Sequence, residues 1–384
     1  MKHLCIVAIS AALSAACLAT ESSDAVAASV VKAIMPSGGS SAVVSPHSVA
    51  VAAGLLGDGM DSRDARIALS EKMGLKTTSF GPTFLRNRMK FEEWGRTNGV
   101  EVLFANSAWL RNYSRIERDF HAMAYRDYDF AFGPLSAVES MNAWSSVRTG
   151  GFVSKVVDEV DPGCDTALIS ASGFDGAWAR PFPPAVDGVF HAEGGDIRLP
   201  MMRDVRTLRM VKRPGYTAFS LVYRGGKLFL YVMLPDRGKT PRAIMESLLP
   251  SELFMLDRAL LPDFNPDDDR GNPMPPVEGA SEATVRLSLP RFRIETKVDF
   301  LPALAALGVQ RTGYDAICKD MRIGIALQSN VFAVSETGGE VGKFDLPAAK
   351  AEGELAEIAC DRPFAFVVRT VDRITLMSGV FAGR

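Results

Sequence analysis

The chain is predicted to fold as one α+β domain, because helix patterns fill its first quarter and strand patterns dominate the remainder. That order is typical of α+β proteins, whereas alternating strands and helices would indicate a parallel α/β sheet. No internal repeat and no Gly/Ser-rich linker divides the 384 residues. A chain of this length can bury one large core, so we predict a single domain over residues 25–384.

Four helices are predicted from apolar periodicity and from residues typical of helix ends. The first stops before Pro36, and the second opens after Pro46 with Ser45 as its candidate N-cap. Ser62 is a candidate N-cap for the third. The predicted ranges are 29–35, 48–56, 62–73 and 84–94.

Strands are predicted where β-branched and aromatic residues gather between turn residues. The polar stretch 262–273 separates two groups of strands and contains Asp267, Asp268 and Asp269. Because it lacks the regular spacing of a calcium-binding EF-hand loop, we interpret it as a solvated surface loop. The predicted strand ranges are 101–104, 167–171, 208–210, 218–223, 228–234, 284–289, 331–334, 364–369 and 374–380.

Residues 1–19 are interpreted as a signal peptide. An apolar run follows Lys2 and His3 and ends before a polar segment, and it is too short for a stable membrane-spanning anchor. Two outcomes stay open: cleavage that releases a secreted or periplasmic chain, or lipidation at Cys17, which follows Ser14-Ala15-Ala16. We expect no transmembrane span in the mature protein.

Charge and cysteine content exclude several classes of protein. The 43 basic and 45 acidic residues nearly cancel, so nothing favours nucleic acid or an anionic membrane as partner. Beyond the leader only Cys164, Cys318 and Cys360 remain, too few and too widely spaced for a disulfide framework or a CxxC metal site.

No catalytic motif is recognisable. The mature chain holds His47, His121 and His191, without HExxH spacing, a GxSxG elbow, a phosphate-binding loop or a GxGxxG segment. Without a nameable nucleophile or base we predict no enzyme activity, no cofactor and no metal site.

A long polar loop near the C-terminus is the most informative feature. Residues 341–359 are small, polar and punctuated by Gly and Pro, and they separate the strand patterns 331–334 and 364–369. Compact domains seldom keep such a loop unless it is functional or disordered. We interpret it as a segment offered to a partner.

Several segments, in one order along the chain, resemble the serpin family of serine protease inhibitors. They are Ser45-Pro46-His47-Ser48, Asn142-Ala143-Trp144 with Thr149-Gly150-Gly151, residues 168–178, Arg180-Pro181-Phe182, Met201-Met202, Leu234-Pro235, residues 289–295 and Glu336-Thr337-Gly338-Gly339. The resemblance implies a serpin-like fold with N-terminal helices, large antiparallel β-sheets and an exposed C-terminal reactive loop. It also implies a monomer that traps a serine protease when the cut loop inserts into a sheet.

The resemblance also implies which residues act. The loop hinge comprises Glu336, Gly338, Gly339, Val341 and Lys343. The family's register places the reactive bond at Glu352-Gly353, with Lys350-Ala351 as the alternative. The sheet-opening region comprises Ser45, Ser48, Ser170, Trp178 and Gln328.

Two departures from the family pattern leave a second function open. Lys343 and Asp345 stand where inhibitory members usually have alanines, and burying unpaired charges is costly. Ser170 and Gln328 replace the usual Asn and His, although the two could still hydrogen-bond to each other. The alternative is a non-inhibitory serpin that binds a partner and whose loop is cleaved as a plain substrate.

The predicted helix 84–94 carries several basic residues, which raises the question of a polysaccharide-binding site. Some serpins bind sulfated polysaccharides through such a helix, and Arg86, Arg88 and Lys90 lie within the range 84–94. Because Glu92 and Glu93 follow at once, we interpret this surface as a solvated helix face.

Overall fold

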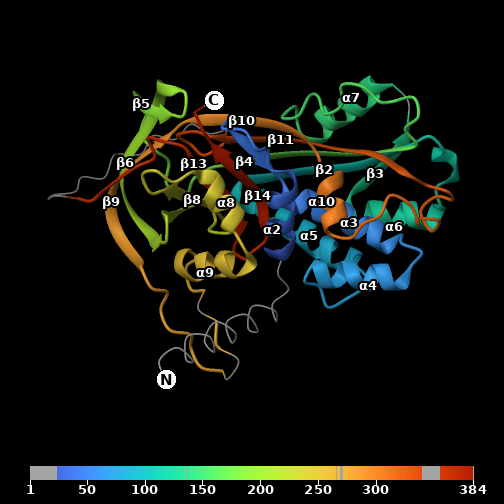
Figure 1. Cartoon of the computed structure of the whole chain (residues 1–384), viewed down its shortest axis with the longest axis horizontal. Helices are drawn as coiled ribbons and strands as arrows, with labels where there is room; N and C mark the ends of the chain where they lie inside the picture. The colour runs from blue at the N-terminus through green and yellow to red at the C-terminus, as the bar shows by residue number, and fades with distance from the viewer. Residues whose placement is uncertain (1–23, 136, 265, 269–270, 340–354, 384) are drawn as a thin grey trace.

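Two β-sheets with helices around them form the molecule in the computed structural model (Figure 1). The structure describes residues 24–135, 137–264, 266–268, 271–339 and 355–383. Its helices are α2 Asp24–Ile34, α3 Pro46–Asp58, α4 Arg63–Lys72, α5 Gly81–Asn98, α6 Arg118–Tyr128, α7 Val138–Arg148, α8 Pro241–Ser247, α9 Pro250–Leu260 and α10 Leu301–Ala306, with a short 3₁₀ turn at Tyr113–Arg115.

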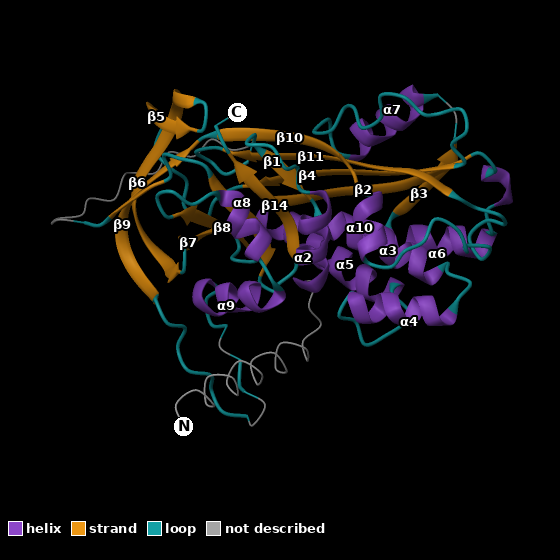
Figure 2. Cartoon of the chain, viewed as in Figure 1, coloured by secondary structure: helices purple, strands orange, loops and turns teal. Residues whose placement is uncertain are grey.

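A five-stranded sheet runs the length of the molecule, in the order β10-β11-β4-β2-β3. Figure 2 shows α7 on one of its faces and α3, α5 and α6 on the other. Its strands are β10 Phe292–Asp299, β11 Ile323–Val334, β4 Thr166–Gly176, β2 Val100–Leu110 and β3 Phe130–Pro134.

A nine-stranded sheet curves around the other half of the core, in the order β1-β14-β13-β8-β7-β6-β9-β12, with β5 paired to β6. Most of its pairs are antiparallel, and the exception is the short β12 beside β9. Its strands are β1 Ala42–Val44, β14 Thr375–Phe381, β13 Phe364–Thr370, β8 Leu228–Pro235, β7 Tyr216–Val222, β6 Gly195–Arg213, β9 Ala280–Pro290, β12 Glu357–Ala359 and β5 Val186–Ala192.

The predicted helices and strands are confirmed, most of them longer than their sequence patterns. Ser45 caps α3 by accepting a hydrogen bond from the Ser48 amide at 3.2 Å, and Ser62 caps α4 in the same way from Ala65. The prediction missed five helices, α6 to α10, of which α8 and α10 are only seven and six residues long. The edge strands β1, β3, β5, β10 and β12 were missed too.

The pair β4 and β11 is unusual because the strands are parallel neighbours with no short crossover between them. Parallel neighbours are normally joined by a single crossover segment, yet residues 177–322 intervene here and supply most of the second sheet. Because they are parallel, the C-terminal ends of both strands lie at the same end of the five-stranded sheet. A chain that turned back from the end of β11 between them would run antiparallel to both.

Other predictions concern cysteines, metals and membranes. Cys164, Cys318 and Cys360 are buried free thiols. In the part of the chain that the structure describes, no three His, Cys, Asp or Glu side chains are placed to hold a metal ion. None of the described helices is long and apolar enough to cross a bilayer.

A buried ion cluster ties the first helix to the centre of the nine-stranded sheet. Arg369 on β13 is fully buried and donates to Asp24 Oδ1 at 2.8 Å and to both carboxylate oxygens of Asp257 on α9. Thr375 accepts a further bond from Arg369, and the Tyr231 hydroxyl donates to Asp257 at 3.1 Å. The one guanidinium therefore has two carboxylate partners, and each charged group of the cluster is hydrogen-bonded, as burial requires.

Replacing Arg369 by Met should lower the free energy of unfolding by about 3–5 kcal/mol, because it leaves two buried carboxylates without their cation. Urea unfolding followed by circular dichroism measures the loss. The exposed pair Arg242–Glu246 provides the matched control, since Arg242→Met should cost less than about 0.5 kcal/mol. Equal losses in the two variants would contradict this account of the cluster.

Candidate functional site

The predicted hinge begins where β11 ends, and its backbone is bonded to the segment that follows β4. The carbonyl of Ser335 accepts from Trp178 Nε1 at 2.9 Å, and the carbonyl of Thr337 accepts from the Trp178 amide at 2.8 Å. The carbonyl of Glu336 accepts from the Phe182 amide at 2.7 Å. Three successive carbonyls thus hold the hinge beside the C-terminal ends of β4 and β11.

The two hinge glycines are required by close approach of the backbone. Gly338 has φ +124°, and a Cβ there would lie 2.0 Å from the Gly176 carbonyl oxygen at the end of β4. A Cβ on Gly339 would lie 1.9 Å from a carboxylate oxygen of Asp175. No side chain fits either position without displacing β4, so this geometry requires glycine at both positions.

The Glu336 side chain adds a further contact on the other side of the hinge. Its Oε1 accepts from the Ala185 amide at 3.1 Å and lies 3.4 Å from Arg291 Nη1. Ser335 Oγ closes the turn by donating to the Gly339 carbonyl at 2.5 Å. The described hinge residues are therefore held by the segment after β4, by Ala185 and Arg291, and by the Ser335 hydroxyl.

A buried polar network joins the start of α3 to β11. Gln328, fully buried, accepts from the Ser45 amide at 2.9 Å and donates to the Ser45 carbonyl at 3.1 Å. The Ser45 hydroxyl lies 3.2 Å from the Ser48 hydroxyl and donates to the Leu376 carbonyl on β14 at 2.9 Å. The structure thus brings together Ser45, Ser48 and Gln328 of the predicted sheet-opening region.

The predicted hydrogen bond between Gln328 and Ser170 is wrong. The two residues are register partners on neighbouring strands, but both polar atoms of the Gln328 amide are taken up by Ser45 and Asn330. Ser170 Oγ is buried and has no hydrogen-bond partner among the described residues. Trp178 lies apart from this network, at the hinge, where its ring stacks on Tyr223 with centroids 4.3 Å apart.

Three polar residues of the five-stranded sheet were missed. Asn330 donates to Gln328 at 2.9 Å and accepts from Ser172, while Asn106 on β2 is the register partner of Ser170. The sequence pattern that could have revealed them is a pair of polar residues two positions apart in an otherwise apolar strand, such as Ser170 and Ser172. Residues two apart in a strand lie on the same face. Polar residues on a buried face form networks or remain unpaired.

The remaining predicted site residues lie outside the described residues. They are Val341 and Lys343 of the hinge and Lys350, Ala351, Glu352 and Gly353 of the two candidate reactive bonds.

Two of the three basic residues predicted on this helix, Arg88 and Lys90 on α5, form contacts within the molecule. Arg88 pairs with Glu92 at 3.2 Å and donates to the Arg126 carbonyl, and Lys90 lies 2.6 Å from Asp372. These contacts favour the interpretation of a solvated helix face over a polysaccharide site.

Comparison with protein families decides the identity of the chain. The family model described as "Serpin (serine protease inhibitor)" matches residues 21–382. The chain is a serpin. Serpins are mostly inhibitors or binding proteins and not catalysts.

Known serpins share moderate sequence identity and the whole fold with this one. The chain is 26% identical to plasminogen activator inhibitor 1 of Bos taurus over 351 residues, which cover 85% of this chain and 82% of the relative. A structure of protease nexin-1 with heparin aligns with a TM-score of 0.77 at 21% identity, covering 97% of this chain and 99% of that one. Thyroxine-binding globulin in complex with thyroxine aligns at 0.76 and 16% identity, covering 94% and 98%.

Replacing Gln328 by Ala should lower the free energy of unfolding by about 1–3 kcal/mol, because it removes both partners of the Ser45 backbone and the acceptor of Asn330. Thermal unfolding of the purified variant measures this loss. Gln310→Ala, at an exposed position of this serpin, is the control and should change stability by less than about 0.5 kcal/mol. An unchanged Gln328→Ala melting temperature would contradict the network.

The stability of this serpin should fall as the pH is lowered from 6.5 toward 4, because burial lowers the pKa of His47 to about 4. In the unfolded chain the imidazole binds a proton below about pH 6.5, whereas in the fold it stays neutral. The contribution of His47 is complete above pH 6.5 and declines by about 1.4 kcal/mol per pH unit below it.

Urea unfolding at pH 7.0 and 5.0 tests this dependence. The loss between the two pH values should be about 2 kcal/mol smaller in His47→Phe than in the wild type. His121→Phe, at a half-buried histidine on α6, is the matched control. The same pH dependence in all three proteins would show that His47 does not carry the effect.

Proposed function

We propose that this serpin inhibits a serine protease by suicide cleavage of its C-terminal loop, followed by insertion of the cut loop between β4 and β11. The observation that carries the proposal is the position of the hinge. The hinge follows the end of β11 and is hydrogen-bonded to the segment directly after β4. It therefore lies between the C-terminal ends of these two parallel strands.

Insertion at this seam, the boundary between β4 and β11, would increase the number of hydrogen bonds between strands. A strand that folds back from the hinge runs antiparallel to both neighbours, so one parallel interface is replaced by two antiparallel ones. Antiparallel pairing is slightly more stable per residue and adds a second ladder of bonds. The gain in free energy would drive the displacement of a protease still attached to the cut loop.

The trapping step depends on geometry in the protease. A serine protease forms an acyl-enzyme with the residue before the cut bond, and deacylation needs reacting groups placed to within about an ångström. Drawing the acyl-enzyme along the sheet would distort that arrangement. We propose Glu352-Gly353 as the cut bond, with Lys350-Ala351 as the alternative, and a serpin that acts as a monomer.

Export completes the proposal. The apolar leader 1–19 supports secretion or delivery to the periplasm, with lipidation of Cys17 as the alternative outcome. The target would then be an extracellular or periplasmic serine protease.

Incubating the purified serpin with trypsin-like, elastase-like and glutamyl-specific serine proteases should give one SDS-resistant adduct, close to the summed mass of the two chains. The reason is that the ester bond of a stalled acyl-enzyme survives denaturation. Mass spectrometry of the released C-terminal peptide identifies the cut bond: a peptide starting at Gly353 or at Ala351 distinguishes the two candidates.

The control is the same protease with its nucleophilic serine replaced by alanine, which should give no adduct. Cleavage of the loop with the protease still active and no adduct would overturn inhibition. That result would favour the alternative function, a serpin fold whose loop is a plain substrate.

A further inference from the structure

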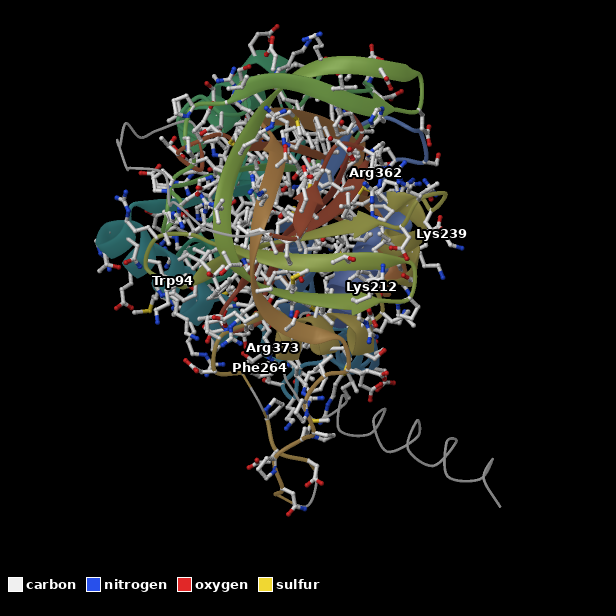
Figure 3. All side chains as sticks on the ribbon, turned by 90° about the vertical axis from the view of Figure 1, so that its left-hand side faces the viewer. Trp94, Lys212, Lys239, Phe264, Arg362 and Arg373 are labelled. Atoms are coloured by element: carbon white, nitrogen blue, oxygen red, sulfur yellow. The ribbon has the colours of Figure 1, made fainter. Side chains whose placement is uncertain are left out.

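A cavity of about 620 Å³ lies between the last turn of α2, the start of α8, and the place where β13 begins and β14 ends. Figure 3 labels Arg362 and Lys239, which directly precede the lining residues Pro363 and Thr240, and shows both on the same side of the molecule. The exposed residue Lys32 also lines the cavity, so it opens to solvent.

The inner wall of the cavity is apolar. Val31 and Met35 of α2, Met245 of α8 and Val380 of β14 line it. Val31 and Met245 are only 5% and 4% exposed, so they belong to the core and form a fixed surface. Apolar groups of a ligand would leave water on contact with this wall, which favours their binding.

A second wall consists of backbone without hydrogen-bond partners. Ser37, Gly38, Gly39 and Ser40 line the cavity and are exposed. None of their amides and carbonyls is hydrogen-bonded to another described residue. The two glycines leave these peptide groups uncovered by side chains. Exposed backbone of this kind can bond to the main chain of a bound peptide, a mode of recognition in which main-chain hydrogen bonds supply the affinity.

Two side chains of opposite charge at the mouth have no ion partner in the part of the chain that the structure describes. Lys32 comes from the last turn of α2, and Glu193 comes from the turn between β5 and β6. The Glu193 carboxylate lies against Gly39, where a Cβ would be 2.1 Å from its Oε2. The other two charges of the lining, Arg242 and Glu246, pair with each other at 2.8 Å.

We propose that this cavity binds a short apolar peptide whose two ends are free. The Lys32 ammonium would pair with the terminal carboxylate and Glu193 with the terminal ammonium, since charge-assisted hydrogen bonds are the strong ones. The peptide groups of residues 37–40 would bond to the ligand main chain, and its side chains would pack on Met35 and Met245.

The size of the cavity favours a peptide over a single amino acid. Pockets that bury a drug-sized ligand have volumes of about 300–1,000 Å³, and a peptide of about four residues is of that size. One amino acid would leave most of the apolar wall in water. The binding does not depend on the proposed inhibition, and its test needs no protease.

Isothermal titration of the full mature chain with the tetrapeptide alanyl-valyl-leucyl-alanine tests the site. The free peptide should bind saturably and raise the melting temperature. The same peptide with an acetylated amino end and an amidated carboxyl end should bind at least tenfold more weakly, because neither charge is then present.

Two variants assign each end of the peptide to its partner. Acetylation should weaken binding at least tenfold in the wild type but hardly at all in Glu193→Gln, because that variant has already lost the partner of the ammonium. Amidation should behave in the same way with Lys32→Gln. Glu159→Gln and Lys319→Gln, at exposed positions elsewhere on the surface, are the matched controls and should bind as the wild type does.

Equal affinities of the free and the doubly capped peptide would overturn the proposal, since the two charges would then contribute nothing. So would the absence of saturable binding to the wild type, which would mean that water alone fills the cavity. Undiminished binding to the double variant of Lys32→Gln and Glu193→Gln would overturn it too, because the peptide would then lie elsewhere, for example as an added strand at the seam.

Discussion

β4 and β11 are parallel neighbours separated by residues 177–322, so no local turn holds them together and their ladder depends on everything folded between them. The intervening segment builds much of the nine-stranded sheet and returns to supply β10, which pairs with β11. Long-range pairings of this kind form late and slowly, because loop closure is paid before the contacts are made.

The two sides of the seam are held differently. On β11, Gln328 is bonded to the Ser45 backbone, so this strand is attached to the helical layer beneath it. On β4, the side-chain hydroxyl of the register partner Ser170 has no hydrogen-bond partner among the described residues, and neither does the side-chain oxygen of Asn106 on β2. Separation of the strands would break the hydrogen bond from Ser172 on β4 to Asn330 on β11 and would leave the bonds between Gln328 and Ser45 intact.

The fold could be predicted because its signals are local or ordered along the chain. Caps at Ser45 and Ser62 and the order of the family segments needed no tertiary knowledge. The polar network could not be predicted in detail, because one side-chain amide can satisfy either Ser170 or Ser45, and only packing decides between them. The hydrogen bonds from Trp178 and Phe182 to the hinge carbonyls could not be predicted either, because every residue has a backbone carbonyl and the sequence does not show which ones are bonded.

The Arg369 cluster has a consequence for the N-terminus. Asp24 is the first residue of α2 and, among the described residues, one of the two carboxylates bonded to the fully buried Arg369 guanidinium. Proteolytic trimming that removes Asp24 would take away one of these acceptors and leave Asp257 as the carboxylate partner. A recombinant chain should therefore begin before Asp24 to keep the cluster whole.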